Sequence, residues 1–318
     1  MMQTSAAGVS DAGRPVKRKK RRIDPKTQFA LYLLIAPVLL LIFVFNYIPM
    51  YGILISFQDF SPFKGVLGSK WVGFKHIAYF LNDETFWKVM RNTLILNFYD
   101  LVFGFTAPIV FALLANEFMH KGIKRVIQTI SYLPHFLSWV VVSGVFYQML
   151  SPTDGIVNAL LGLLNIDPVY FMVDKDLFRG IVVSSGVWKE VGWSAILYFA
   201  VIAGIDSSQY EAAMIDGAGR IRQMWHITLP GMVPMIILLL LLRLSSIFAI
   251  GFERLFVMQN PLVLDVSDVI STYVYRAGLL QAQYSLTTAI GFVQSVLGFL
   301  LLITANKLSK KLVGMGLY

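Results

Sequence analysis

The sequence predicts an all-α integral membrane protein, and three observations support this prediction. Of the 318 residues, 57% are hydrophobic and only 14% are charged, which is far from the balance of an ordinary soluble domain. Long apolar runs recur along the chain, and a helix that crosses about 30 Å of hydrocarbon needs about 20 such residues. These runs are continuously apolar, whereas the strands of a membrane barrel alternate over about ten residues.

Six runs are long enough to cross a bilayer. The first, third and sixth contain no charged residue, and the second, fourth and fifth each carry one or two charges. The six expected spans cover residues 29–57, 93–116, 126–150, 181–205, 231–252 and 286–305. An even number of transmembrane helices places both termini on the same side of the membrane.

The distribution of basic residues indicates which side that is. Of the 27 Lys and Arg residues, 16 lie in the N-terminal tail, at the C-terminus and in the loops after spans two and four, whereas eight lie in the other loops. The positive-inside rule therefore predicts cytoplasmic termini. Residues 1–26 are polar and basic and are expected to form a disordered tail, whose charges orient the first span and bind no nucleic acid. Residues 29–57 are too long for a cleaved signal peptide, so we expect a retained span.

Several kinds of chemistry have no support in the sequence. The chain has no cysteine, which excludes disulfides, thiol catalysis and thiolate metal sites. Its four histidines are scattered without a metal-binding motif, so no metal is expected. No phosphate-binding Gly-x-x-x-x-Gly-Lys-Ser/Thr run is present, so the chain is expected not to be an enzyme and to bind no ATP.

Residues 206–230 form a polar island between spans four and five. They are too many for a tight connection, so they need structure of their own. Ser207 or Ser208 can cap a first helix, Gly217 can end it, and Pro230 is expected at the start of span five. The island is expected to be a helix, a turn and a second helix lying along the membrane face, where it presents side chains to a partner.

The spacing within this island resembles the EAA motif of the membrane subunits of binding-protein-dependent ABC importers. In that family the motif forms the coupling helix, which docks on the ATPase subunit. The residues that match the motif, together with the turn residue Asp216, are Glu211, Ala212, Ala213, Gly217, Ile227, Leu229 and Pro230. The alternative is a solvated loop without a partner, although the complete spaced pattern is far more specific than an isolated Glu-Ala-Ala.

The remainder of the chain resembles the oligosaccharide and polysaccharide branch of these importers and, within it, permease subunits of bacterial alginate importers. The segments that carry this resemblance are residues 47–52, 133–136, 251–254, 272–276 and 305–308. The resemblance implies a type I importer permease fold over residues 27–318, in the bacterial cytoplasmic (inner) membrane. It also implies an external solute-binding protein, a saccharide substrate, a second permease subunit in a heterodimer, and two ABC ATPases that bind ATP and Mg.

Three charges are expected near mid-bilayer, where they should face a cavity or one another. We expect Glu190 to pair with Arg243 or Lys189, so that a leftover cation lines the path and suits an acidic sugar. The alternative is that all three pair at a helix interface. Asp100 lies nearer the outer end of its span and is expected to be exposed to water or to cap a helix.

Five aromatic residues are candidates for stacking on a sugar, because their rings offer flat apolar faces. They are Trp188, Trp193, Tyr198, Phe252 and Tyr275. Aromatic residues near span ends also serve as interface anchors, and this alternative stays open.

The function expected from these features is ATP-driven import of an oligosaccharide, with an acidic, alginate-like saccharide as the narrower expectation. An ion-coupled secondary carrier or a channel subunit is the alternative, because charges within the membrane are compatible with ion coupling. A membrane scaffold that transports nothing is a third interpretation.

Overall fold

The structure is a computed structural model that describes residues 25–118, 120–245, 247–248 and 251–314. It divides into two compact units, Met1–Tyr51 and Gly52–Tyr318, which are described separately. The described part of the first unit is helical and consists of α1 (Pro25–Ile42), the π-helical turn η1 (Phe43–Tyr47) and α2 (Ile48–Met50). The expected disorder of the tail concerns residues 1–24, which lie outside the described residues, whereas Pro25 and Lys26 belong to α1.

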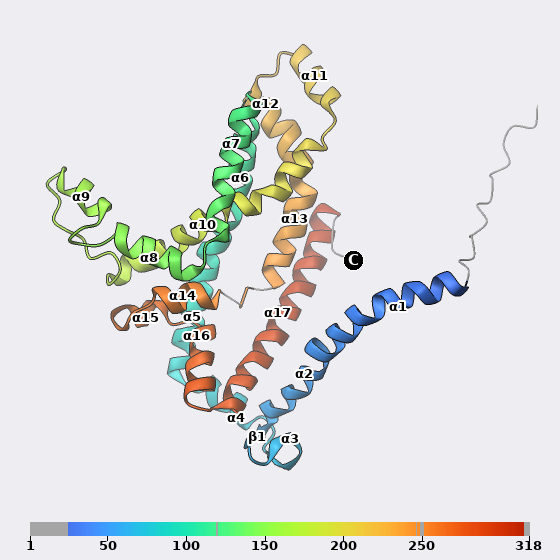
Figure 1. Cartoon of the computed structure of the whole chain (residues 1–318), viewed down its shortest axis with the longest axis vertical. Coiled ribbons are helices and arrows are strands. Elements are labelled where there is room, and N and C mark those ends of the chain that lie inside the picture. The colour runs from blue at the N-terminus through green and yellow to red at the C-terminus, as the bar shows by residue number, and fades with distance from the viewer. Residues whose placement is uncertain (1–24, 119, 246, 249–250, 315–318) are drawn as a thin grey trace, which may run out of the picture. The chain divides into compact units, whose positions relative to one another are not determined.

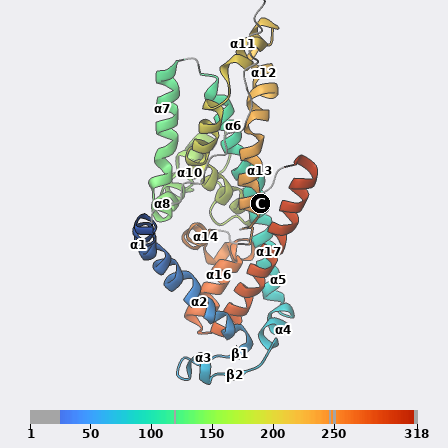
Figure 2. The same cartoon turned by 90° about the vertical axis from the view of Figure 1, so that its right-hand side faces the viewer.

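The second unit is almost entirely helical. After η2 (Tyr51–Phe57), its elements are β1 (Gln58–Asp59), α3 (Gly65–Gly68), β2 (Lys70–Trp71), α4 (Lys75–Leu81), α5 (Glu84–Tyr99), η3 (Asp100–Gly104), α6 (Phe105–Asn116), α7 (Lys121–Tyr132), η4 (Leu133–Phe136), α8 (Trp139–Met149), α9 (Ile156–Gly162), α10 (Lys175–Ala203), α11 (Ser207–Ile215), α12 (Arg220–Gln223), η5 (Met224–Thr228), α13 (Leu229–Ser245), α14 (Phe252–Met258), η6 (Pro261–Val263), α15 (Leu264–Ser267), α16 (Ile270–Val274), η7 (Tyr275–Leu280) and α17 (Tyr284–Val313). The two strands pair antiparallel, with Gln58 opposite Trp71. Within this unit, α11 and α4 lie at opposite ends, and α13 runs beside α17 (Figures 1 and 2).

Four helices of the described chain are long and apolar enough to cross a membrane, namely Phe29–Phe57, Glu84–Asn116, Arg220–Ser245 and Tyr284–Lys311. Two sharply bent helix pairs raise the number to six if each pair counts as one span. All six expected apolar runs therefore fall on helices, although several boundaries differ from the expected ones. The second span begins nine residues earlier than expected because Asp83 caps its helix, accepting a hydrogen bond from the backbone N–H of Thr85.

The third expected span, residues 126–150, is wrong as a continuous helix. It is broken between α7 with η4 and α8, and the two parts meet at 104°. Leu137 and Ser138 are extended at the break, and Ser138 caps α8 by accepting a hydrogen bond from the N–H of Val141. Pro134, at the start of η4, lacks the N–H that would continue the helix of α7, which explains the break.

The fifth expected span, residues 231–252, is displaced. The helix instead runs from Arg220 to Ser245, and a separate helix, α14, begins at Phe252. The π-helical turn η5 lies just before Pro230, where the N–H of Leu229 donates to the carbonyl of Met224. Because Pro230 cannot donate, this wider turn rearranges the hydrogen bonds while the helix continues. Pro230 therefore lies inside a continuous helix and does not begin a span.

Helix α10 forms the centre of the second unit. Ala195, Tyr198 and Ile202 on α10 pack with Ala112 of α6 and Met232 of α13 in one buried cluster. A second cluster, around Phe178, Val182, Leu255 and Met258, packs the N-terminal part of α10 against α14 and its following loop. The charged residues Lys189 and Glu190 of α10 lie between these two clusters.

Candidate functional site

The polar island begins with a capped helix. Asp206 is the N-cap of α11, and its Oδ1 accepts a hydrogen bond of 3.0 Å from the backbone N–H of Ser208. The expected cap at Ser207 or Ser208 is therefore wrong by one or two residues. A carboxylate caps a helix as well as a serine hydroxyl does, and its charge is also favoured by the helix dipole.

The end of α11 is set by Gly217. Its φ of +74° is the left-handed conformation that favours glycine. The N–H of Ala218 donates to the carbonyl of Ala213 over 2.8 Å, and the N–H of Gly217 donates to the carbonyl of Met214 over 3.1 Å. These two bonds form a Schellman motif, which satisfies the last carbonyls of the helix. Gly217 thus occupies the turn position that the sequence assigned to it.

After the turn, the chain enters α12 and continues through η5 into α13 without interruption. The expected separate second helix is therefore not observed, because α12 is the first turn of the continuous helix from Arg220 to Ser245. Tyr210 on α11 and Thr228 on η5 are joined through their hydroxyl oxygens, 2.9 Å apart. Gln223 supports the turn by donating from Nε2 to the carbonyl of Ala218 over 2.8 Å.

Four large apolar side chains are exposed on this island. They are Met214, Ile215, Ile221 and Trp225, with Ile215 87% and Ile221 71% exposed. We call these four residues the coupling face. Of the motif residues, Glu211, Ala212, Asp216, Gly217 and Pro230 are also exposed, whereas Ala213, Ile227 and Leu229 are half-buried. Exposed apolar residues gathered on an otherwise polar segment are typical of a docking surface.

A cavity of about 730 Å³ lies in the middle of the second unit. It brings together four of the residues that the sequence proposed for the substrate path or for stacking on a sugar, namely Glu190, Trp193, Tyr198 and Arg243. Four further lining residues, Asp100, Trp139, Gly186 and Arg254, complete a wall that combines two carboxylates, two guanidinium groups and two indole rings. This combination of aromatic faces with few charged groups suits a polar ligand that carries flat apolar surfaces.

Asp100 and Arg254 form a buried ion pair at this cavity. Arg254 donates from Nη2 to Oδ2 over 2.5 Å and from Nη1 to Oδ1 over 3.2 Å. The two side chains are only 8% and 7% exposed. The expectation that Asp100 is exposed or caps a helix is therefore wrong, because Arg254 neutralises it inside the protein. Arg254 was not among the residues that the sequence analysis proposed for the site. Its position between two apolar segments is the signal that could have identified it.

A second charged group joins α10 to the break between α7 and α8. Glu190 Oε1 lies 3.4 Å from Lys189 Nζ, and Glu190 Oε2 lies 2.7 Å from His135 Nδ1. Lys189 is buried and donates to the backbone carbonyl of His135. The imidazole of His135 stacks on Trp193, with 4.3 Å between ring centroids. The expected pairing of Glu190 with Lys189 is observed. Arg243, the other expected partner of Glu190, lies near Asp100 instead, with 3.7 Å between Arg243 Nη2 and Asp100 Oδ2.

The other three aromatic candidates lie outside this cavity wall. Phe252 and Tyr275 line a separate hollow, and their ring centroids are 5.2 Å apart. Trp188 packs edge-on against Phe146, with 6.0 Å between centroids. Among the described residues, no group of three or more His, Asp or Glu side chains is placed to hold a metal ion.

Comparison with known proteins identifies the family. Residues 104–314 match the model of the binding-protein-dependent transport system inner membrane component. The chain belongs to this family. It is therefore a multi-pass membrane protein and the permease subunit of an ABC transporter, with the type I permease fold.

Two relatives from Bacillus subtilis (strain 168) resemble this permease over most of its length. Protein LplB is 44% identical over 288 residues, which cover 91% of each chain. The polygalacturonan/rhamnogalacturonan transport system permease protein YteP is 41% identical over 302 residues, which cover 95% of this chain and 94% of YteP.

Two solved structures share the fold. One is a bacterial ABC transporter involved in the import of the acidic polysaccharide alginate, whose matching chain has a TM-score of 0.84 and 39% identity, with 91% of this chain and 97% of that chain covered. The other is a bacterial alginate ABC transporter in complex with an alginate pentasaccharide-bound periplasmic protein. Its matching chain has a TM-score of 0.85 and 38% identity, with 92% of this chain and 98% of that chain covered.

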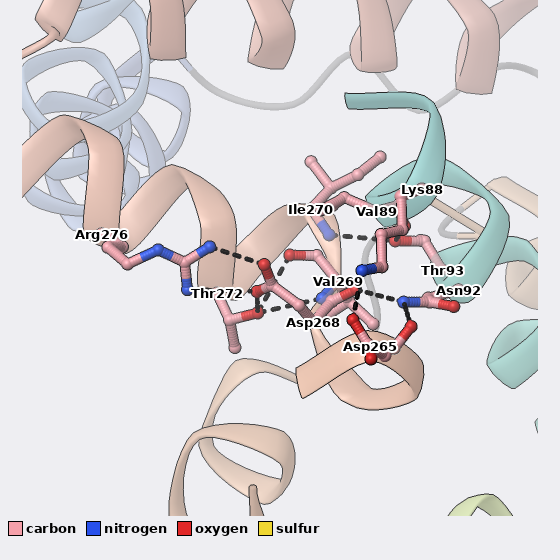
Figure 3. Close-up of polar contacts among 10 residues, drawn as sticks. All are labelled: Lys88, Val89, Asn92, Thr93, Asp265, Asp268, Val269, Ile270, Thr272 and Arg276. Carbon is pink, nitrogen blue, oxygen red and sulfur yellow. Dashed lines mark hydrogen bonds and ion pairs between the residues drawn. The ribbon is translucent and has the colours of Figure 1, made fainter. Parts of the chain in front are cut away.

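The loop after α14 in this permease is fixed by a polar network (Figure 3). Asn92 of α5 donates from Nδ2 to the carbonyls of Asp265 and Asp268, each over 3.0 Å. Asp265 pairs with Lys88 and Lys175, and the hydrogen bond from Lys175 is the main cause that lowers its pKa to about 2. The loop is therefore held to both α5 and α10.

The same loop is fixed to the start of α16. Arg276 holds Asp268 through a 2.5 Å contact between Nη2 and Oδ2, and Thr272 donates to the other carboxylate oxygen over 2.8 Å. Thr93 of α5 accepts a 2.9 Å hydrogen bond from the N–H of Ile270 (Figure 3). These contacts order a segment that would otherwise carry unsatisfied backbone groups.

Proposed function

We propose that this permease crosses the bacterial inner membrane six times, with both termini in the cytoplasm, and imports an oligosaccharide when partner ATPases hydrolyse ATP. The four long helices and two bent pairs provide six crossings if each bent pair is one span. The excess of Lys and Arg in the tail and in the loops after spans two and four favours the cytoplasmic side for both termini.

The observation that carries this proposal is the exposed coupling face on α11, α12 and η5. Ile215 and Ile221 are among its exposed apolar residues, and it lies directly beside the motif residues Glu211, Ala212 and Ala213. An apolar surface of this kind is stabilised when a partner groove covers it. We infer that the groove belongs to an ABC ATPase, which binds the ATP and Mg, since this chain has no phosphate-binding loop.

The hydrogen bonds around the turn explain how docking could move the membrane helices. Tyr210 fastens α11 to Thr228, and Thr228 lies in the continuous helix from Arg220 to Ser245. A displacement of α11 is therefore passed to α13 through one hydrogen bond and one short turn. The residues proposed to act in coupling are Glu211, Ala212, Ala213, Asp216, Gly217, Ile227, Leu229 and Pro230.

The proposed substrate is an acidic oligosaccharide that an external binding protein delivers. Two solved relatives belong to transporters of alginate, which is an acidic polysaccharide, and YteP is named for the transport of polygalacturonan and rhamnogalacturonan. The central cavity supports this assignment because Trp193, Glu190 and Arg243 line it together. A second, different permease subunit would complete the path. We place the remaining candidates in supporting positions around this path; they are Lys189, Trp188, Phe252 and Tyr275.

Co-purification and ATPase measurements test the proposal. The complete transporter is extracted with its ATPases and compared with the variant Ile215→Glu, which puts a charge in the coupling face. We expect this variant to lose the ATPases, because a buried carboxylate without a partner opposes docking. Leu163→Glu, at an exposed apolar position outside the island, is the matched control and should retain them.

Reconstitution of the same preparation into vesicles distinguishes the alternatives. An importer should hydrolyse ATP faster when the saccharide-loaded binding protein is added. An ion-coupled carrier would instead accumulate saccharide without ATP, and a scaffold would show neither response. Retention of the ATPases by Ile215→Glu would show that the coupling face is not the docking surface.

A further inference from the structure

A second cavity, of about 610 Å³, lies beside α17. Its wall comes from α13, α14, α16, η7 and α17, and we call it the α17 cavity. Its volume lies within the range of about 300–1,000 Å³ that small-molecule sites occupy. None of the described residues that line it carries a charge. It therefore differs from the central cavity, whose wall contains two carboxylates and two guanidinium groups.

Gln294 places an amide group in the wall of the α17 cavity. It belongs to a helix that is long and apolar enough to cross a membrane. Its Nε2 donates to the carbonyl of Phe248 over 3.0 Å, which fixes the orientation of the amide because a carbonyl can only accept. Its Oε1 forms no hydrogen bond to another described residue. A polar atom within the apolar part of a membrane is unfavourable without a partner, so this oxygen requires a donor from water or from a ligand.

Tyr275 contributes a ring and a hydroxyl group to the same wall. It is the first residue of the π-helical turn η7, and turns of this kind occur frequently at functional sites. The rings of Phe252 and Phe256 hold its ring, with centroids 5.2 and 5.1 Å away. Its hydroxyl forms no hydrogen bond to another described residue. The cavity wall therefore combines a packed aromatic cluster with a hydroxyl and an amide oxygen that can bind a ligand.

These groups match the chemistry of an uncharged sugar unit. A sugar ring carries hydroxyl groups around its edge, which both donate and accept hydrogen bonds, and its faces of C–H groups can pack on aromatic rings. The hydroxyl of Tyr275 can donate to such a group, and Oε1 of Gln294 can accept from one. A lipid chain offers a partner to neither atom.

The α17 cavity is adjacent to the central cavity. Gly251 lines the central cavity, and Phe252, the next residue, lines the α17 cavity. On α13, Leu239 lines the central cavity and Ser245 lines the α17 cavity. The start of α14 therefore separates the two cavities, and an oligosaccharide has several sugar units with which to reach both.

We propose that the α17 cavity is a saccharide subsite that binds the hydroxyl groups of one sugar unit through Gln294 and Tyr275. This inference rests on the proposed function and deepens it, because it adds a subsite whose described wall has no charge. The subsite binds acidic and neutral sugar units alike, since only their shared hydroxyl groups and ring faces meet its wall. Discrimination between acidic and neutral saccharides then belongs to other parts of the transporter.

A thiol placed in the cavity tests this subsite in the assembled transporter. The chain has no cysteine, so Gly291→Cys introduces its single thiol. Gly291 lines the α17 cavity, and a Cβ there meets no described atom within 4 Å. The complete transporter is reconstituted in vesicles, and modification of this chain by a methyl or a benzyl thiosulfonate is followed by mass spectrometry. Gly180→Cys, at an exposed position of α10 with equally open space, lines neither cavity and is the matched control.

We expect the saccharide-loaded binding protein to slow the modification of Gly291→Cys during ATP-driven import, and not that of Gly180→Cys. An oligosaccharide whose carboxyl groups are reduced to alcohols should protect as well as the acidic one. Tyr275→Phe, added to Gly291→Cys, should weaken the protection by a factor of about 2 to 10, because one hydrogen bond is lost. A change of conformation alone would protect equally without this hydroxyl.

Transport after modification gives a second measurement. The benzyl group fills the cavity after the transporter has folded and assembled, so it should block uptake of both saccharides in Gly291→Cys. The methyl group should leave most of the uptake, and neither reagent should affect Gly180→Cys. If Gly291→Cys itself does not import, Ser295→Cys, at an exposed position of the same wall, replaces it.

The inference would be overturned if neither saccharide slowed the modification, if only the acidic one did, or if Tyr275→Phe left the protection unchanged. Uptake that survives the benzyl group would also overturn it. Modification of the isolated permease but not of the complete transporter would show that the second permease subunit covers the cavity, with the same consequence. In all these cases the wild-type transporter still imports oligosaccharide. If the wild-type assembly imports neither saccharide, the proposed function fails instead.

Discussion

The hydroxyl oxygens of Tyr210 and Thr228 lie 2.9 Å apart and join the first helix of the polar island to the helix that enters the membrane. Thr228 is 1% exposed, so its hydroxyl has no access to water when this bond is lost. Thr228 is part of the π-helical turn η5, which precedes Pro230. The bond therefore connects the coupling face to the point where the span has an irregular hydrogen-bond pattern.

Replacement of Tyr210 by Phe should loosen this connection. A single hydrogen bond contributes about 0.5–1.5 kcal/mol, so we expect saccharide import per ATP hydrolysed to fall by a factor of about 2 to 10. The ATPases should still co-purify, because Tyr210 is not part of the coupling face. Tyr170→Phe, at an exposed position outside the island, is the control. An unchanged ratio of import to hydrolysis in Tyr210→Phe would remove the bond from the coupling path.

Gly217→Ala tests whether the turn after α11 needs the left-handed backbone conformation of Gly217, because the added methyl group meets no steric obstacle among the described residues. No described atom lies within 4 Å of the position that a Cβ would take, but φ is +74°. An L-residue in this conformation costs about 1–2 kcal/mol, so ATPase affinity should fall by a factor of about 5 to 30. Gly219→Ala is a close control, because Gly219 has similarly open space and a φ of −68°. Equal affinities for both variants, measured with purified ATPase, would contradict the role of the turn.

Alanine substitutions at three glycines of α10 should affect the stability of the folded protein to different extents. A Cβ at Gly192 would lie 2.2 Å from the backbone oxygen of Ser131, and one at Gly186 would lie 2.2 Å from the side chain of Arg254. Backbone cannot rotate away as a side chain can, so Gly192→Ala should destabilise most, by about 2 kcal/mol or more.

Gly186→Ala should have an intermediate effect, because Arg254 must shift from Asp100. Gly180→Ala meets no described atom within 4 Å and should be neutral or slightly stabilising, since alanine favours helices by about 1 kcal/mol over glycine. Thermal unfolding of the three detergent-solubilised variants gives the order. A Gly180→Ala variant as unstable as Gly192→Ala would contradict the packing described for α10.

The sequence predicted features that depend on local pattern. Apolar runs located the helices because span length is fixed by bilayer thickness. Gly217 was assigned to a turn because glycine readily adopts a positive φ, and it has that conformation. The break at Leu137–Ser138 had local signals in Pro134 and in the capping serine, but the uninterrupted apolar run obscured them.

Contacts between distant residues could not be predicted in this way. Asp100 and Arg254 are 154 positions apart, and nothing near either residue in the sequence indicates the other as its partner. Only the packing of η3 and of α14 against α10 brings them together with Gly186. The same limit applies to His135, whose ring meets Glu190 and Trp193 because the helix breaks where it does.

Asp265 makes the loop after α14 sensitive to acid. Lys175, and to a lesser extent Lys88, lower the pKa of Asp265 from 3.8 to about 2 by hydrogen bonding and charge. Because the folded pKa is the lower one, the pairing stabilises the loop above about pH 4 and this contribution is lost as the pH falls toward about 2. Hydrogen exchange of residues 264–270 in the reconstituted protein should show protection that decreases over this range. Asp265→Asn should be less protected at neutral pH and should lack this part of the decrease. Asp154→Asn, in the loop between α8 and α9, should behave as wild type. An equal decrease in Asp265→Asn and wild type would show that other carboxylates hold the loop.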